Sequence, residues 1–394
     1  MAAFAAETFK DLFGYLNIKK DITKDNISFR IVTAGSFSVF IISAFICGLT
    51  SYFGSPIVCD VHKYDQSGGP NFRDLIEAHC WLHGTRLMEE SYGLADGETC
   101  LTKQDMDDDA SHTLYYQWVV FMLILSAILL KLPALIWSML EGKLMSAFHN
   151  EENKGSGILK KNQNDLKEAV EEEAIMFEKI AGSWTTNIYY LKFLACQLLA
   201  LTVLIVNFHI TDLFLNNKFK TYGTDVMEYF NNIGTGDQLN PMCNTFPTRV
   251  SCTMNKFGTS GLTDTFNSYC ILRQNIINEK IYLFLWFWFA AMFAIISLQL
   301  FLELCFLALP FIRQFFIFQA AGNKFLSSNM KAYLKKRSVG DVFVLYQMSK
   351  NTHSSFFYDL LEHLSCPNNE ETEPLVKFDE GNEKMELKNT NQEA

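Results

Sequence analysis

Charged residues are missing from four long stretches of this chain of 394 residues. Residues 31–53, 193–210 and 281–302 carry no charge, and residues 119–140 carry only Lys131. An apolar run of about 18 residues or more can cross a bilayer as a helix, whereas helices of soluble proteins average about 11–12 residues and keep a polar face. The absence of charge therefore argues against a chain of ordinary soluble domains and predicts four transmembrane helices.

Catalytic motifs are also missing. The sequence has no phosphate-cradling glycine loop, no zinc motif and no nucleophile elbow. We therefore expect no enzyme activity, no cofactor and no nucleic-acid partner.

Basic residues are scarce between the first two stretches. Residues 54–114 hold four basic and twelve acidic residues, whereas five basic residues precede the first stretch and seven lie between Arg313 and Lys350. Because Lys and Arg collect on the cytosolic side of membrane proteins, we expect both termini and residues 141–188 in the cytosol. Residues 54–114 and 216–279 are then extracellular.

These patterns divide the chain into ten segments. They are an amphipathic N-terminal segment (1–30), span 1 (31–53), outer loop 1 (54–114), span 2 (115–140), a helical cytosolic loop (141–188), span 3 (189–215), outer loop 2 (216–279), span 4 (280–308), a helical cytosolic tail (309–366) and a disordered tail (367–394). Within the helical tail we expect a break at Gly340. The fold class predicted is an all-α membrane protein with a helical cytosolic domain and a small disulfide-linked extracellular domain of short strands and helix.

Aromatic residues with polar tips stand at the start of two spans. Tyr115, Tyr116 and Trp118 open span 2, and Trp286 and Trp288 lie near the start of span 4. Such side chains settle where hydrocarbon meets headgroups, so we expect these clusters to mark one membrane face.

Six of the ten cysteines lie in the two outer loops. They are Cys59, Cys80 and Cys100 in the first loop, and Cys243, Cys252 and Cys270 in the second. An even number in an oxidising compartment predicts a disulfide framework, although six cysteines allow 15 pairings and spacing does not choose among them. A metal site at the neighbouring histidines of Cys80 is the weaker alternative.

An acidic run at the end of outer loop 1 contains Asp107, Asp108 and Asp109. Like-charge runs are usually solvated, which is the main interpretation here. A Ca²⁺ site is the alternative, because Ca²⁺ favours oxygen ligands.

Several motifs resemble those of the innexins, the invertebrate gap-junction proteins. The most specific is "YYQWV", formed by Tyr115, Tyr116, Gln117, Trp118 and the valine that follows. Other segments that resemble the family, in the same order along the chain, are "GSPIVC", "HCWLHGT", "PALIW", "YGTDV", "FPTRVSC", "EKIYLFLWFW" and "GDVFVLYQMSKN". The chain departs from the family pattern at Val120, where proline is usual, and in having six outer cysteines where four are usual.

The resemblance implies a large-pore channel in the plasma membrane. Subunits would associate into a ring of eight, alone or with other innexin subunits, surrounded by membrane lipids. Two rings on adjacent cells would dock through their outer loops and pass ions and small molecules. An undocked hemichannel and a non-conducting four-span adhesion or scaffold protein remain alternatives.

The resemblance also implies roles for particular residues. Nested bridges between the loops would pair Cys59 with Cys270 and Cys80 with Cys252, and the same order extended inward would pair Cys100 with Cys243. Glu7 and Asp11 of the N-terminal segment would lie in the cytosolic funnel of the pore and favour cations. The serines Ser36, Ser38 and Ser43 of span 1 suit either a wet pore wall or close helix packing.

Overall fold

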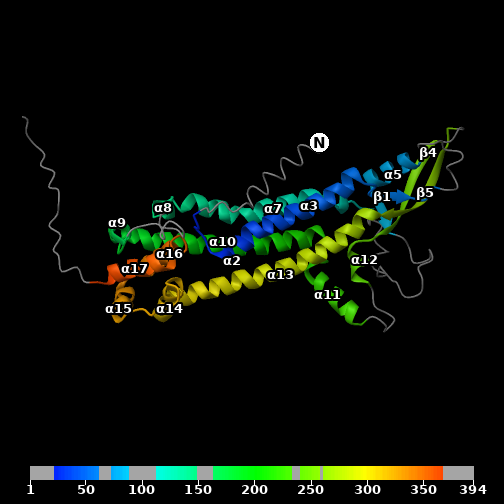
Figure 1. Ribbon diagram of the computed structural model, residues 1–394. Helices are drawn as coiled ribbons and strands as arrows, with labels where there is room; N and C mark the ends of the chain where they lie inside the picture. The colour runs from blue at the N-terminus through cyan, green and yellow to red at the C-terminus, as the bar shows by residue number, and fades with distance from the viewer. Residues whose placement is uncertain are drawn as a thin grey trace, which may run out of the picture.

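The computed structural model describes residues 22–61, 72–87, 112–148, 163–232, 240–257 and 261–366. Long helices run side by side along the molecule, with strands gathered at one end and shorter helices at the other (Figure 1). We call these two regions the strand end and the helical end.

Within the described ranges, four helices are long and apolar enough to cross a membrane. They are span 1, Ile27–Phe53, made of α2 (Ile27–Arg30), η1 (Ile31–Gly35) and α3 (Ser36–Phe53); span 2, α7 (Tyr115–Leu140); span 3, α10 (Trp184–Phe214); and span 4, α13 (Arg273–Ala308). With 36 residues, α13 is about 54 Å long and exceeds the roughly 30 Å hydrocarbon layer. The helix begins at Arg273, before the apolar run that starts near residue 280. Its first two turns hold polar side chains that are buried against neighbouring segments.

The four spans form a bundle in which each helix contacts two others. Span 1 packs against spans 2 and 4, and span 3 packs against the same two. Large side chains fill the interior, among them Phe40, Leu123, Leu204 and Phe289. Other large apolar side chains on every span remain exposed, which suits lipid or neighbouring subunits rather than water. The predicted four-span membrane fold is thereby confirmed.

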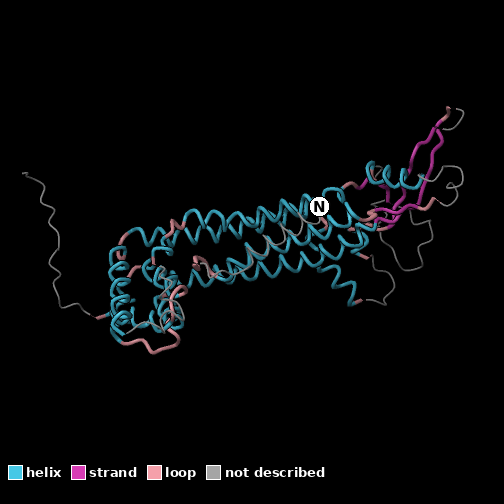
Figure 2. The backbone as a smooth tube through the Cα atoms, turned by 45° about the horizontal axis from the view of Figure 1, so that its top comes forward, coloured by secondary structure: helices cyan, strands magenta, loops and turns pink. Residues whose placement is uncertain are grey.

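The strand end is built on a five-stranded antiparallel sheet in the order β1-β5-β4-β2-β3. Its strands lie together at one end of the molecule (Figure 2). Its strands are β1 (Ile57–Cys59), β2 (Thr85–Leu87), β3 (His112–Thr113), β4 (Arg249–Phe257) and β5 (Thr263–Leu272). The helices of this end are α5 (Phe72–His83), α11 (Phe219–Asn231) and α12 (Pro241–Thr245). The longest strands, β4 and β5, pair along their whole length as a hairpin. The segment between spans 1 and 2 and the segment between spans 3 and 4 thus contribute strands to one sheet.

The helical end contains the described segments between spans 2 and 3 and after span 4. Its helices are α8 (Leu144–Ala147), α9 (Gln163–Ile180), α14 (Pro310–Ala320), α15 (Ser328–Lys336), α16 (Val339–Ser349) and α17 (Ser354–Ser365). Helix α16 is largely buried and packs against span 3 and α14. The sequence prediction of a break at Gly340 is wrong. The break precedes Ser338, whose side chain caps α16 in a capping box with Asp341, so Gly340 lies inside the first turn.

Candidate functional site: the strand end and its links to the spans

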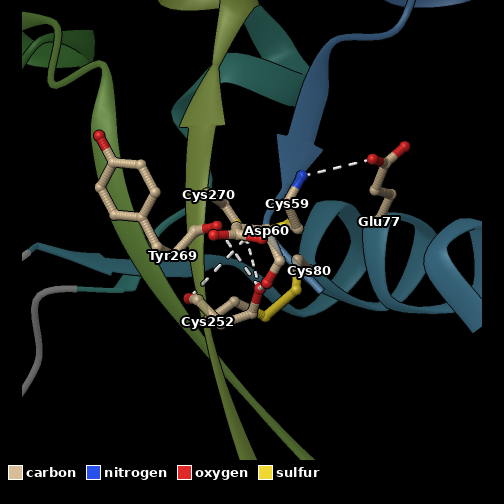
Figure 3. Close-up of a disulfide and its surroundings, with 8 residues drawn as sticks. Cys59, Asp60, Glu77, Cys80, Cys252, Tyr269 and Cys270 are labelled. Carbon is tan, nitrogen blue, oxygen red and sulfur yellow. Dashed lines mark hydrogen bonds between the residues drawn. A yellow bond between two sulfur atoms is a disulfide. The ribbon is translucent and has the colours of Figure 1, made fainter. Parts of the chain in front are cut away.

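Two disulfides fasten the sheet at the strand end (Figure 3). Cys59 of β1 bonds to Cys270 of β5, and the two residues are direct partners across the sheet with Cα atoms 4.0 Å apart. Cys80 of α5 bonds to Cys252 of β4, with Cα atoms 5.8 Å apart. These are the two pairings that the family resemblance implies. Both bridges connect the segment after span 1 to the segment before span 4.

Cys243, in α12, is disulfide-bonded as well. Its predicted partner Cys100 lies outside the described residues, so this third pairing stays a prediction. The sulfur atoms of Cys59, Cys80 and Cys270 lie within 4.8 Å of one another, a spacing that a metal ion could use. Each of them is in a disulfide, however, and a disulfide leaves no thiolate to bind a metal.

Packing and hydrogen bonds hold the bridged segments in place. The face of α5 that carries Cys80 is buried against the sheet, and the Phe72 ring lies 5.7 Å from that of Phe266. The Cys59 N–H donates to Glu77 of α5 at 3.3 Å (Figure 3). Beyond β1, Asp60 donates its N–H to the carbonyl of Tyr269 at 2.8 Å. The strand end is therefore a small core with its own cross-links.

The motif at the start of span 2 joins that core to the bundle. Tyr116 is fully buried, and its ring centroid lies 4.7 Å from that of Trp81 in α5. The side-chain amide of Gln117 donates to the carbonyl of Trp81. The Tyr115 hydroxyl donates to the carbonyl of Thr245 at 3.5 Å. These three motif residues attach span 2 to α5 and to the end of α12.

Tyr115 and Tyr116 make their contacts with protein, and the expected position of this cluster at the membrane surface stays a prediction. Of the motif residues, Trp118 is 60% exposed and can meet lipid, whereas both tyrosines pack inside the protein. An aromatic ring with a polar tip suits a headgroup layer and a protein interface equally. Sequence alone could not show that α5 covers this position.

The aromatic residues of span 4 also face protein partners. Tyr282 is buried, and the indole of Trp286 donates to the carbonyl of Lys220 at 3.2 Å. Gly223 of α11 lies against that indole so closely that a Cβ atom there would approach it to 2.2 Å. Trp288 donates to the Ser36 hydroxyl of span 1 at 3.0 Å.

A cluster of buried amides, which the sequence reasoning missed, joins spans 1 and 4 beneath the sheet. The Asn275 side chain donates to the carbonyl of Pro247 at 2.7 Å. Gln274 donates to Asn278 at 3.1 Å and to the carbonyl of Cys47 at 3.4 Å. All three amide side chains are fully buried. Their spacing, which places them on one helix face, was the signal that could have revealed them.

The three serines of span 1 differ in their surroundings. Ser36 is fully buried with its hydroxyl bonded to Trp288, and Ser43 is buried and donates to the carbonyl of Val39 at 2.9 Å. Ser38 is partly exposed and donates to the carbonyl of Ala34 at 3.0 Å. Burial therefore removes Ser36 and Ser43 from the expected pore wall of this subunit and leaves Ser38. The exposed face of α3 is otherwise mostly apolar, with Ile42, Phe45, Ile46 and Leu49.

A buried carboxylate, Glu303 of span 4, forms a second polar centre near the helical end. It accepts hydrogen bonds from Asn26 at 3.1 Å, Gln197 at 3.4 Å and Gln299 at 3.0 Å. The Tyr190 hydroxyl lies 3.2 Å from its backbone carbonyl. Glu303 thus joins the beginning of span 1 to spans 3 and 4.

Lys350, at the end of α16, extends this centre into the helical end. Its ammonium group donates to the Asn26 side chain and lies 4.3 Å from the Tyr346 ring centroid. Burial lowers the pKa of Lys350 to about 8, although Glu303 and Asp25 favour its charged form. A cavity of about 600 Å³ opens beside these residues, between span 1, span 4 and α16.

Several sequence predictions fall on residues outside the described ranges. They are the pore-funnel residues Glu7 and Asp11, the bridge cysteine Cys100, and the acidic residues Asp107, Asp108 and Asp109.

Comparison with known proteins is consistent with this arrangement. A family model described as Innexin matches residues 25–366. Innexin inx2 of Drosophila melanogaster is 28% identical over 366 residues, which cover 91% of this chain and 95% of the relative. Innexin inx1 of Schistocerca americana is 29% identical over 352 residues, 88% of this chain and 93% of the relative. Innexin shaking-B of Drosophila melanogaster is 28% identical over 365 residues, 90% and 94% of the two chains.

The family match includes all four spans, the bridged strand end and the described helices of the helical end. Membership points to an oligomeric, multi-pass membrane channel rather than to an enzyme. The chain belongs to the innexin family of gap-junction proteins.

Proposed function

We propose that this chain is a subunit of a large-pore gap-junction channel that passes ions and small molecules between adjacent cells. The observation that carries the proposal is the strand end, which two disulfides fasten at one end of a four-span innexin bundle. A rigid rim favours docking because ordering a flexible surface on binding costs free energy.

The strand end is extracellular in this proposal, and both termini are cytosolic. Disulfides form and persist in oxidising compartments, which supports this orientation. Eight subunits, of this chain alone or together with other innexin subunits, form a ring, and two rings dock through their strand ends. Symmetry of purified rings seen by electron microscopy tests the number eight, and any other rotational symmetry contradicts it.

The pore lining in this proposal includes Glu7 and Asp11 at the cytosolic funnel and Ser38 in span 1. A cysteine at each of these positions should slow conduction when a thiol reagent is applied from the cytosolic side. Unchanged current at all three positions, with labelling verified by mass, would contradict the lining.

The run Asp107–Asp109 remains a solvated loop in this proposal, with a Ca²⁺ site as the alternative. Loss of external Ca²⁺ block on changing all three to Asn would favour the alternative.

Recording from paired cells that express only this chain tests the function. The expected result is current between the cells that disappears when the cells are separated. Current in single cells without junctional current would instead indicate a hemichannel. Neither current, with the protein present at the surface, would indicate an adhesion or scaffold protein.

A further inference from the structure

A groove of about 920 Å³ lies among α9, α15 and α17 at the helical end. We call it the terminal groove, because Cys366, the last described residue, lines it (Figure 1 shows the three helices). Ile175 of α9 lies in this groove and is 50% exposed, although α9 is not one of the spans. An exposed apolar side chain inside a groove favours a binding surface for another apolar group.

The charged groups of the terminal groove are mostly basic. Lys179, Lys336 and Arg337 line it, and among the described residues Glu178 is the one acidic side chain that does. The Glu178 carboxylate already accepts a hydrogen bond from Tyr333 at 2.8 Å and pairs with Arg337. Lys179 and Lys336 are both exposed. The groove therefore offers positive charge beside an apolar contact.

The sequence that follows Cys366 has the complementary character. Residues 370–380, "EETEPLVKFDE", place five carboxylates around Leu375, Val376 and Phe378. Residue 370 is only four positions beyond Cys366, a distance of at most about 14 Å along an extended chain. A segment tethered at the rim of a groove meets it at an effective concentration in the millimolar range, so even weak contacts can hold it.

We propose that the terminal groove binds residues 370–380 of the same chain. Acidic side chains of this segment contact Lys179 and Lys336, and one of its apolar side chains covers Ile175. A flat anionic membrane surface would use the same lysines but would not reach an apolar group between helices. Binding here ties α9, which precedes span 3, to the segment that follows span 4, whether or not the channel docks.

Cysteine cross-linking in the full-length protein tests the proposal. In a Cys366→Ser background, Ile175→Cys is combined with Val376→Cys, and the purified ring is oxidised under mild conditions. The expected product is a bridge within one chain, found by peptide mapping. The matched control is Asn164→Cys with Val376→Cys, because Asn164 is exposed on the same helix but about 16 Å away along its axis. The control pair should link more slowly.

Charge reversal tests the basic contacts. Adding Lys179→Glu and Lys336→Glu should slow the Ile175→Cys link about fivefold, as expected for two exposed ion pairs that together contribute about 1 kcal/mol. Lys167→Glu with Lys335→Glu is the control, since both lysines are exposed on the same helices and neither lines the groove. Equal cross-linking rates at Asn164 and Ile175 would overturn the proposal. A cross-linking rate at Ile175 that does not change when Lys179 and Lys336 are reversed in charge would also overturn it. A bridge found only between two chains would assign the groove to a neighbour's tail and overturn it too.

A measurement on the unmodified chain guards against misfolded variants. Limited trypsin digestion should cut after Lys377, inside the bound segment, more slowly than after Lys384, beyond it. Addition of salt should reduce the difference, because salt screens exposed charges. Equal cutting at both lysines in low salt would contradict binding.

Discussion

Gly340 lies where α16 is packed tightly against span 3. A Cβ atom on Gly340 would lie 2.4 Å from the carbonyl atoms of Thr186 and 2.5 Å from the Asn187 nitrogen. Because these are backbone atoms, the helices would have to separate. We expect Gly340→Ala to lower the free energy of unfolding by about 1–3 kcal/mol, seen as a lower Tm in detergent.

Gly48→Ala is the control for this substitution. A Cβ atom at Gly48 meets only Val120, at 3.9 Å, which is ordinary contact. Its Tm should stay near that of the native protein. A Gly340→Ala variant as stable as Gly48→Ala would show that the contact between α16 and span 3 can relax without cost.

Lys350 gives the protein a pH dependence. Burial lowers its pKa from 10.5 to about 8 in the folded protein. Between these values the unfolded chain binds more protons than the folded one, so stability rises with pH, by at most about 1.4 kcal/mol per pH unit. Below pH 8 the full cost of burying the charge is present.

Lys350→Met should remove this dependence. The Tm of the native protein should rise relative to that of the variant between pH 8 and pH 10. The variant also loses the hydrogen bond to Asn26, which shifts the difference in Tm by the same amount at every pH. Lys336→Met, which changes an exposed lysine, should follow the native curve. A native-minus-variant difference that does not change with pH would contradict the assignment.

Among the helices, α16 depends on the cap at its first turn. The Ser338 hydroxyl accepts the Asp341 N–H at 3.2 Å, and the Asp341 carboxylate accepts from the Ser338 N–H at 3.2 Å. Asp341 also accepts from the Thr186 hydroxyl at 2.7 Å and from the Gly182 N–H at 3.2 Å. One carboxylate therefore caps α16 and attaches it to the turn before span 3.

Substitutions at Ser338 and Asp341 should distinguish the capping of α16 from its attachment to span 3. Ser338→Ala should cost about 1 kcal/mol of stability, a usual loss for a helix cap. Asp341→Ala should cost more, because it also leaves the buried Thr186 hydroxyl without this partner. Thermal unfolding of the two variants gives the order, and an Asp341→Ala variant more stable than Ser338→Ala would show that the attachment to span 3 contributes nothing.

At the scale of the whole molecule, the disulfides connect the segment that follows span 1 to the segment that precedes span 4. The Cys80–Cys252 bridge has a sequence separation of 172 residues. In the chain-entropy model such a bridge contributes at most about 5 kcal/mol. Cys80→Ser with Cys252→Ser should therefore loosen the strand end and abolish current between paired cells, while the protein still reaches the surface. Cys366→Ser, which changes an exposed free cysteine, is the control. Undiminished junctional current in the double variant would show that docking does not need this bridge.

The spans and their order could be predicted from the sequence because a membrane-crossing helix is recognised by the length of an apolar run and by its lack of charge. Span 2 begins and ends where the prediction placed it, at residues 115 and 140. Helix α13 begins seven residues before the expected start of span 4, and these residues include the polar Gln274, Asn275 and Asn278, which in a sequence indicate the end of a membrane helix. Only partners from other segments, such as the Pro247 carbonyl, make these amides part of a buried helix.

The sequence by itself determined that this protein crosses a membrane four times, because uncharged runs of that length have no stable place in water. The tertiary structure alone decided which polar residues are buried. Tyr116 packs under α5, Ser36 bonds to Trp288, and Glu303 accepts hydrogen bonds from Gln197 of span 3 and from Asn26, just before span 1. A hydrogen bond between residues more than 100 positions apart leaves no local pattern, since its energy depends on partners that folding brings together.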